Sequence, residues 1–140
     1  MDFKKLANQY RDELLDNVLP FWLEHSQDIE FGGYFSCLDR EGKVFDTDKF
    51  IWLQGREVWM FSMLYNKVEK RQEWLDCAVQ GGEFLKKYGH DGNYNWYFSL
   101  DRSGRPLVEP YNIFSYTFAT MAFGQLSLAT GNQEYADIAK

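Results

Sequence analysis

The sequence predicts an all-α fold built from repeated helical pairs, with short β-hairpins between the helices. Three observations predict this fold. Apolar residues recur at three- and four-residue spacing along most of the chain. Turns that contain glycine separate the apolar segments. One segment of the chain also recurs about 62 residues later, which is typical of a repeat architecture.

The first helix is predicted over residues 3–25. Pro20 lies inside its apolar pattern, so we expect it to kink the helix or to divide it in two. Gly131 is expected to end a later helix, because glycine is common just after a helix C-terminus. Further helices are predicted at about 50–69, 72–88 (ending at Gly89) and 112–130, and a fifth begins at Asn132.

The first helix is followed by a short hairpin. Residues 34–38 are predicted to form a strand, residues 39–43 a turn, and residues 44–45 the returning strand. Residues 46–48, Asp-Thr-Asp, are expected to supply the N-cap of the next helix, since their side chains can accept hydrogen bonds from its first N–H groups.

The repeat is visible in residues 35–42, which are echoed by residues 98–104 with one residue fewer between Ser and Leu. Asp39 and Asp101 are offset by 62 residues. The same offset relates Ile51 to Ile113, Trp52 to Phe114 and Trp59 to Met121. The repeating unit is therefore expected to be a hairpin followed by two helices.

Helical repeats bury their apolar faces against neighbouring repeats, and about three are needed for a stable stack. The 140 residues hold only a little over two. We therefore expect the chain to be the N-terminal part of a longer polypeptide, or to assemble with other copies, for example as a homodimer. A closed ring of six units and an open solenoid are both compatible with the repeat.

The composition excludes several classes of function. A net charge of −6 disfavours nucleic acids and anionic membranes as partners. Cys37 and Cys77 form no CxxC motif, so neither a metal site nor a disulfide framework is expected. The charged, amphipathic N-terminal segment does not have the apolar pattern of a signal peptide, so we expect a cytoplasmic location. Aromatic residues make up 19% of the chain, more than is usual, and can line a sugar-binding cleft as well as fill a core.

The segment from Ile51 to Trp59 is the strongest candidate for a functional site. Arg56 follows Trp52 by four residues and precedes Trp59 by three, so the three side chains are expected on one helix face. An arginine there needs an anionic or carbonyl-rich partner. That partner is either a carboxylate of the protein, with Asp48 and Glu109 as candidates and stacking on Trp52, or a ligand.

Residues 52–59, Trp-Leu-Gln-Gly-Arg-Glu-Val-Trp, resemble the WLQGRxVW segment of the N-acylglucosamine 2-epimerase family. Four further segments are similar to that family, in the same order and at similar spacing: residues 21–26, 32–35, 81–85 and 113–115. The resemblance implies an (α/α)6 barrel, in which residues 1–140 form the N-terminal part, about the first third, of a single barrel domain.

The resemblance also implies an activity. The family interconverts N-acetylglucosamine and N-acetylmannosamine by removing and returning a proton at C2 of the open-chain sugar. Arg56 would contact the carbonyl or enolate oxygen, and Trp52, Trp59 and Phe114 would bind the sugar. The family's acid/base histidines lie in a later part of the chain and have no counterpart here. No cofactor is implied, although a nucleotide such as ATP is implied as an activator.

Phe114 occupies a place where the cellobiose-epimerase branch has a tyrosine, which favours an N-acyl sugar over cellobiose. His25 and His90 match neither family histidine and are expected to be surface or helix-terminal residues. The alternatives are a related isomerase or cellobiose 2-epimerase, a glycoside hydrolase with Asp48 and Glu109 as its two carboxylates, and a non-catalytic binding protein.

Overall fold

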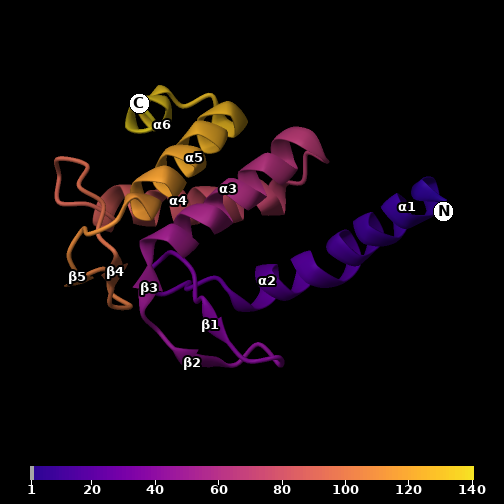
Figure 1. The fold of residues 1–140 in the computed structure, drawn as a ribbon, viewed down its shortest axis with the longest axis horizontal. Coiled ribbons are helices and arrows are strands. Elements are labelled where there is room, and N and C mark those ends of the chain that lie inside the picture. The colour runs from indigo at the N-terminus through magenta and orange to yellow at the C-terminus, as the bar shows by residue number, and fades with distance from the viewer. Residues whose placement is uncertain (1) are drawn as a thin grey trace.

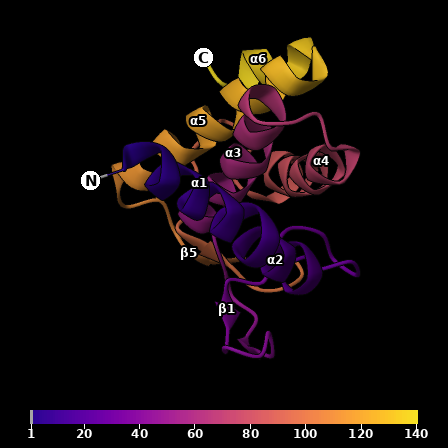
Figure 2. The ribbon, with the colours of Figure 1, turned by 90° about the vertical axis from the view of Figure 1, so that its right-hand side faces the viewer.

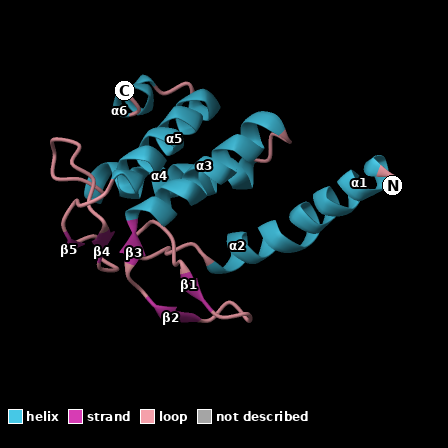
Figure 3. Ribbon diagram, viewed as in Figure 1, coloured by secondary structure: helices cyan, strands magenta, loops and turns pink. Residues whose placement is uncertain are grey.

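The computed structural model describes residues 2–140, and it is rich in helix (Figures 1 and 3). The helical elements are α1 (Phe3–Glu13), a π-helix (Leu14–Val18), α2 (Leu19–His25), α3 (Ile51–Lys67), α4 (Gln72–Tyr88), α5 (Ile113–Thr130) and α6 (Gln133–Ile138). The strands are β1 (Cys37–Leu38), β2 (Val44–Asp46), β3 (Lys49–Phe50), β4 (Ser99–Leu100) and β5 (Pro106–Val108). Among residues 2–140, no helix combines the length and apolar character needed to cross a membrane.

Helices α3, α4 and α5 form the packed body of the structure, and α3 and α5 lie side by side along their lengths (Figure 1). Helix α6 packs against α5. The strands lie at one end of this helical body, where the chain leads into α3 and into α5 (Figure 3). Helices α1 and α2 form one long rod that passes in front of α3 when the molecule is turned (Figure 2).

The repeat predicted from the sequence is confirmed by the structure. The antiparallel pair β1 and β2 recurs, 62 residues later, as the antiparallel pair β4 and β5. Helices α3 and α5 start at Ile51 and Ile113, which are related by the same offset. Each of these helices is followed by a second helix, α4 or α6, so the repeating unit is a hairpin and a helical pair.

Pro20 divides the first helix, as predicted. Proline lacks an N–H group, and its ring clashes with the carbonyl of the residue four positions earlier. The chain responds by widening into a π-helix, in which the Leu19 N–H bonds to the Leu14 carbonyl five residues back. The apolar stripe of this rod is exposed on its N-terminal side, at Phe3, Leu6, Tyr10, Leu14 and Val18.

The predicted N-cap at residues 46–48 is wrong. Phe50 occupies the N-cap position of α3, and no side chain caps this helix. The reason is that Lys49 and Phe50 form strand β3, which pairs with Leu100 and Ser99 of β4. The N–H of Ile51 donates to the Phe98 carbonyl at 3.0 Å, so the second hairpin satisfies the start of α3.

The predicted strand at residues 34–38 is shortened to Cys37–Leu38. Tyr34 instead bonds to the side chain of Gln54 on α3, which accepts from the Tyr34 N–H and donates to the Tyr34 carbonyl, both at 2.8 Å. The Tyr34 hydroxyl donates to the Cys77 carbonyl of α4 at 2.7 Å. The loop before β1 is therefore fixed to two helices at once.

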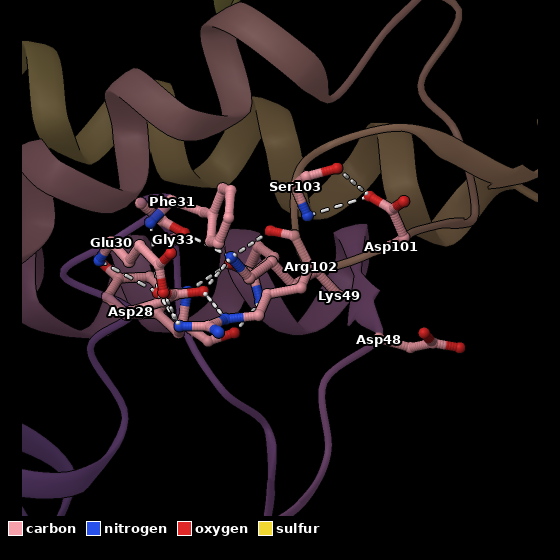
Figure 4. Close-up of polar contacts among 12 residues, drawn as sticks. Asp28, Glu30, Phe31, Gly33, Asp48, Lys49, Asp101, Arg102 and Ser103 are labelled. Atoms are coloured by element: carbon pink, nitrogen blue, oxygen red, sulfur yellow. Dashed lines mark hydrogen bonds and ion pairs between the residues drawn. The ribbon is translucent and has the colours of Figure 1, made fainter.

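A cluster of three charged residues joins the loop before β1, strand β3 and the turn after β4 (Figure 4). Asp28 and Lys49 are buried, and Arg102 is partly exposed. The ammonium of Lys49, which is fully buried, donates to Asp28 Oδ2 at 2.9 Å, to the Gly32 carbonyl and to the Arg102 carbonyl. Arg102 bonds to both oxygens of Asp28, through Nε at 2.9 Å and Nη2 at 3.0 Å. All three ammonium protons of Lys49 thus have acceptors, which a buried cation requires.

The electrostatics of this cluster favour its charged form. Burial raises the pKa of Asp28, but the hydrogen bonds from Arg102 and Lys49 outweigh burial and lower this pKa to about 2. Burial lowers the pKa of Lys49, and its contacts with Asp28 oppose that change. Asp28 is the one carboxylate shared by both cations.

Three glycines allow close packing of the helices. A Cβ at Gly81 would collide with the ring of Tyr34, and one at Gly82 with the Leu126 side chain. These two glycines therefore let Tyr34 and Leu126 pack directly against α4. A Cβ at Gly55 would lie 2.9 Å from the backbone carbonyl carbon and oxygen of Phe118. Backbone atoms cannot rotate away as a side chain can, so the absence of a side chain at Gly55 allows the close approach of α3 to α5.

We predict opposite effects for alanine at two helical glycines. Gly55→Ala should lower the free energy of unfolding by about 1–3 kcal/mol, because α3 must move away from α5. Gly124→Ala is the matched control: its Cβ would meet no atom within 4 Å, so helix propensity should raise stability by up to about 1 kcal/mol. Urea denaturation measures both, and equal effects would contradict the close approach at Gly55.

Candidate sugar-binding site

The candidate site is built on the first three turns of α3, where successive residues face different surroundings. Gln54 is buried and holds the Tyr34 backbone. Gly55 faces α5. Arg56 is exposed, so the helix presents a cation beside two residues that fix its own position. The start of α3 is held in turn by Lys49, two residues before the helix begins.

Arg56 has no carboxylate partner in the part of the chain that the structure describes. No Asp or Glu oxygen of residues 2–140 lies within 4.0 Å of its guanidinium, so the alternative that paired it with Asp48 or Glu109 is wrong. The expected stacking on Trp52 is present, with the guanidinium carbon 5.7 Å from the ring centroid. A second ring, Phe118, lies 5.5 Å away. These rings hold the cation without neutralising it.

Arg56 lines two cavities. The first, which we call the Trp52 cavity, has a volume of about 390 Å³ and lies between α3 and α5. Its lining is mostly aromatic, with Asn112 as a neutral polar group at the start of α5. Flat apolar rings beside a cation and an amide are the surfaces that a sugar ring and its oxygens would contact. The lining residues are Trp52, Arg56, Phe98, Asn112, Phe114 and Phe118.

The second cavity, which we call the Glu57 cavity, has a volume of about 290 Å³ and lies between α2 and α3. Its lining combines four apolar side chains with an arginine, a carboxyl group and a hydroxyl group. The lining residues are Trp22, Ser36, Leu53, Arg56, Glu57, Trp59 and Met60. The Ser36 hydroxyl oxygen is buried and has no hydrogen-bond partner within residues 2–140.

The carboxyl group of Glu57 is unusually basic. Burial raises its pKa to about 8, against the opposing effect of the hydrogen bond with Ser26. The Ser26 hydroxyl lies 2.6 Å from the Trp22 carbonyl and 2.5 Å from Glu57 Oε1. A hydroxyl has one proton and a carbonyl can only accept, so both contacts are satisfied together when Glu57 is protonated and donates to Ser26.

The structure brings most of the predicted site residues together. Trp52, Arg56 and Phe114 line the Trp52 cavity, and Trp59 lines the Glu57 cavity on the other side of Arg56. Phe118 was missed, although it follows Phe114 by one helical turn and shares its face, which is a signal the sequence contains. Glu57 was also missed, because its partner Ser26 is 31 residues away.

The remaining candidates lie outside both cavities. Asp48 and Glu109, the pair considered for a glycosidase, line neither. His25 ends α2, where its ring packs against Phe21. His90 packs against Trp96, and burial lowers its pKa. Among residues 2–140, no group of three or more His, Cys, Asp or Glu side chains is placed to hold a metal ion.

The described residues thus form stacked helical pairs with hairpins at one end, and they place an arginine without a carboxylate partner among aromatic rings. Comparison with known proteins identifies the family. The family model for N-acylglucosamine 2-epimerase (GlcNAc 2-epimerase) matches residues 33–140, and the chain belongs to this family.

Individual relatives agree with this assignment. The chain is 47% identical over 128 residues to the N-acylglucosamine 2-epimerase of Mus musculus, and 29% identical over 141 residues to the cellobiose 2-epimerase of Dictyoglomus turgidum. Its fold matches the solved cellobiose 2-epimerase of Bacillus thermoamylovorans with a TM-score of 0.88 at 30% identity. The match covers 97% of this chain and 35% of that one.

The chain spans about a third of the length of these relatives. The mouse match covers 89% of this chain but 30% of the mouse protein, and the Dictyoglomus match covers 36% of its protein. The chain therefore has the fold of part of an α/α barrel, with two hairpin-and-helical-pair units and a preceding helical rod.

We predict that Glu57 makes the chain less stable as the pH rises from about 4.5 to about 8. Its pKa is raised from 4.5 to about 8 on folding, so in this range the folded state holds a proton that the unfolded state has lost. The resulting stability is fully present below pH 4.5 and is lost as the pH passes through 8. The loss should be up to about 5 kcal/mol, since one pKa unit corresponds to about 1.4 kcal/mol.

Glu57→Gln is the matched variant, because an amide can donate to Ser26 but does not ionise. Thermal unfolding followed at several pH values should show the variant gaining stability relative to the unchanged chain between pH 4.5 and 8. Parallel profiles for the two proteins would contradict the assigned protonation of Glu57.

Proposed function

We propose that this chain supplies part of the substrate pocket of a sugar 2-epimerase that interconverts N-acetylglucosamine and N-acetylmannosamine. The observation that carries the proposal is the unpaired guanidinium of Arg56, held between aromatic rings at the junction of two cavities. Family membership and the name of the mouse relative support the same activity.

The chemistry needs a cation where Arg56 lies. Epimerisation at C2 removes a proton from the carbon next to the sugar carbonyl, and negative charge then develops on the carbonyl oxygen. A guanidinium stays charged at any working pH and can hold two oxygens at once. Because no protein carboxylate within residues 2–140 occupies it, Arg56 is available to stabilise that oxyanion.

The proposal assigns substrate contact to the aromatic residues. Trp52 and Phe114, one repeat apart in sequence, would stack on the apolar face of the sugar from α3 and α5. Trp59 would contact the part of the substrate beyond Arg56. Proton transfer is assigned to groups outside these 140 residues, since His25 and His90 line neither cavity.

The proposal also covers the cofactors, location and assembly of the enzyme. It requires no cofactor, because a proton is removed and returned at the same carbon, and a nucleotide such as ATP enters only as an activator. We place the protein in the cytoplasm with an amino sugar as its partner, and keep a homodimer as its assembly. A cellobiose 2-epimerase is the second candidate, favoured by the structural match.

We predict that the isolated chain does not exchange the C2 proton of N-acetylmannosamine in deuterated water, whereas a chimera does. In the chimera, this chain replaces the matching segment of the mouse N-acylglucosamine 2-epimerase, with which it is 47% identical. Arg56→Lys in the chimera should lower kcat by about 100-fold or more, since an ammonium cannot reproduce the two-oxygen contact.

Arg11→Lys is the control, because Arg11 is an exposed arginine on α1 that lines neither cavity. Nuclear magnetic resonance of the sugar measures the exchange. Full activity of the Arg56→Lys chimera, or rapid exchange by the isolated chain, would be incompatible with the proposal.

A further inference from the structure

The Glu57 cavity is not explained by the stacking of a sugar ring. It lies on the side of Arg56 away from Phe114, and it contains polar groups without full hydrogen bonding. Glu57 Oε1 is engaged by Ser26, whereas Glu57 Oε2 has no hydrogen bond to any residue of 2–140. The Ser36 hydroxyl in the same lining is also unpaired.

The Glu57 cavity combines an apolar wall with polar and charged groups. One wall is apolar, formed by half-buried Trp22, Leu53 and Met60. The polar groups are the Ser36 hydroxyl, a cationic donor, Arg56, and a carboxyl group, Glu57, whose free oxygen can accept a hydrogen bond. A small ligand that fits must present an acceptor to the arginine, a donor to the carboxyl oxygen and an apolar group to the wall. An acyl amide has these three parts: a carbonyl, an N–H and a methyl group.

Connectivity within the substrate places an acyl amide here. In a 2-acylamino sugar, the amide is attached to C2, the carbon next to the carbonyl. If Arg56 holds the carbonyl or enolate oxygen at the edge of the Trp52 cavity, then the C2 substituent is the group closest to Arg56. The adjoining space on its other side is the Glu57 cavity, because Arg56 lines both.

We infer that the Glu57 cavity is the subsite for the acyl amide of the substrate, with Glu57 as the specificity-determining residue. This inference rests on the proposed function. Glu57 Oε2 accepts from the amide N–H, Arg56 donates to the amide carbonyl, and the methyl group packs against Trp22, Leu53 and Met60. Ser26 orients the carboxyl group through Oε1, at 2.5 Å.

A neutral Glu57 suits this role better than an ionised one. An ionised carboxylate beside Arg56 would compete for the guanidinium, yet no ion pair joins the two groups in the structure. Burial favours the uncharged form, in agreement with the pKa of about 8. Glutamine should therefore replace Glu57 in this subsite, since its amide can donate to Ser26 and its carbonyl can accept from the ligand.

The test uses the indole N–H signals of the 140-residue chain, which report separately on the two cavities. Trp52 lines the Trp52 cavity, and Trp22 and Trp59 line the Glu57 cavity. N-acetylmannosamine should shift all three signals. Mannose, which has a hydroxyl group in place of the acyl amide, should shift the Trp52 signal alone. Acetamide, which is the amide without the sugar, should shift Trp22 and Trp59 and leave Trp52 unchanged.

Two substitutions at one position separate hydrogen bonding from packing. Glu57→Leu should weaken N-acetylmannosamine binding about tenfold and leave mannose binding unchanged, because the amide N–H loses its acceptor. Glu57→Gln should keep the affinity for N-acetylmannosamine within about twofold. The acetamide titration of the unchanged chain needs no variant, so it decides the question even if Glu57→Leu fails to fold.

The outcomes distinguish this inference from the proposed function. If both sugars shift Trp52 but acetamide and N-acetylmannosamine leave Trp22 and Trp59 unchanged, the acyl subsite is overturned and the sugar site stands. If Trp22 and Trp59 respond to acetamide but neither sugar shifts Trp52, the sugar-stacking role of the Trp52 cavity is overturned. If no probe shifts any of the three signals, both assignments are overturned.

Discussion

The shared carboxylate of Asp28 is the interaction on which the rest of the structure depends. It accepts hydrogen bonds from Lys49 of strand β3, 21 residues away in sequence, and from Arg102 in the turn after β4, 74 residues away. Lys49 immediately precedes the N-cap of α3. The cluster therefore determines where α3 begins, and through α3 it determines where Arg56 lies.

Successive residues of helix α3 contact different neighbouring segments. Gln54 fixes the loop at Tyr34, Gly55 admits the backbone of Phe118, and Ile51 N–H is satisfied by the second hairpin. None of these three contacts involves Arg56, whose guanidinium has no carboxylate partner within residues 2–140. The contacts that position the helix therefore leave a cation at the boundary of two cavities, which is the arrangement that a pre-organised oxyanion site requires.

Much of the fold followed from local pattern, because helical periodicity and the 62-residue repeat depend on residues close together or on simple recurrence. The short strand β3 and the buried position of Lys49 could not be predicted in this way. Strand β3 is two residues long and pairs with Leu100, about 50 residues away, so neither its length nor its composition marks it. Lys49 would be assigned to the surface from its residue type, since buried lysines are rare unless paired. Its burial depends on Asp28 and Arg102, which no local pattern connects to it.

The candidate site was likewise predictable only in part. Trp52, Arg56 and Phe114 were predictable from helix spacing, the repeat and the resemblance of residues 52–59 to a known family. The second cavity was not predictable, because it forms where α2 passes α3. The raised pKa of Glu57 depends on its burial in the folded chain, which no local pattern indicates.

The measurement that tests the central claim most directly is a double-mutant cycle between Asp28 and Lys49, followed by urea unfolding at neutral pH. Asp28→Asn leaves buried Lys49 without a carboxylate and leaves Arg102 with Glu30 alone, and it should cost about 3–5 kcal/mol. Combined with Lys49→Met, it should cost less than the two single substitutions added together, with a coupling free energy of about 2–3 kcal/mol. Effects that add to within about 0.5 kcal/mol would contradict the claim that this cluster organises the start of α3.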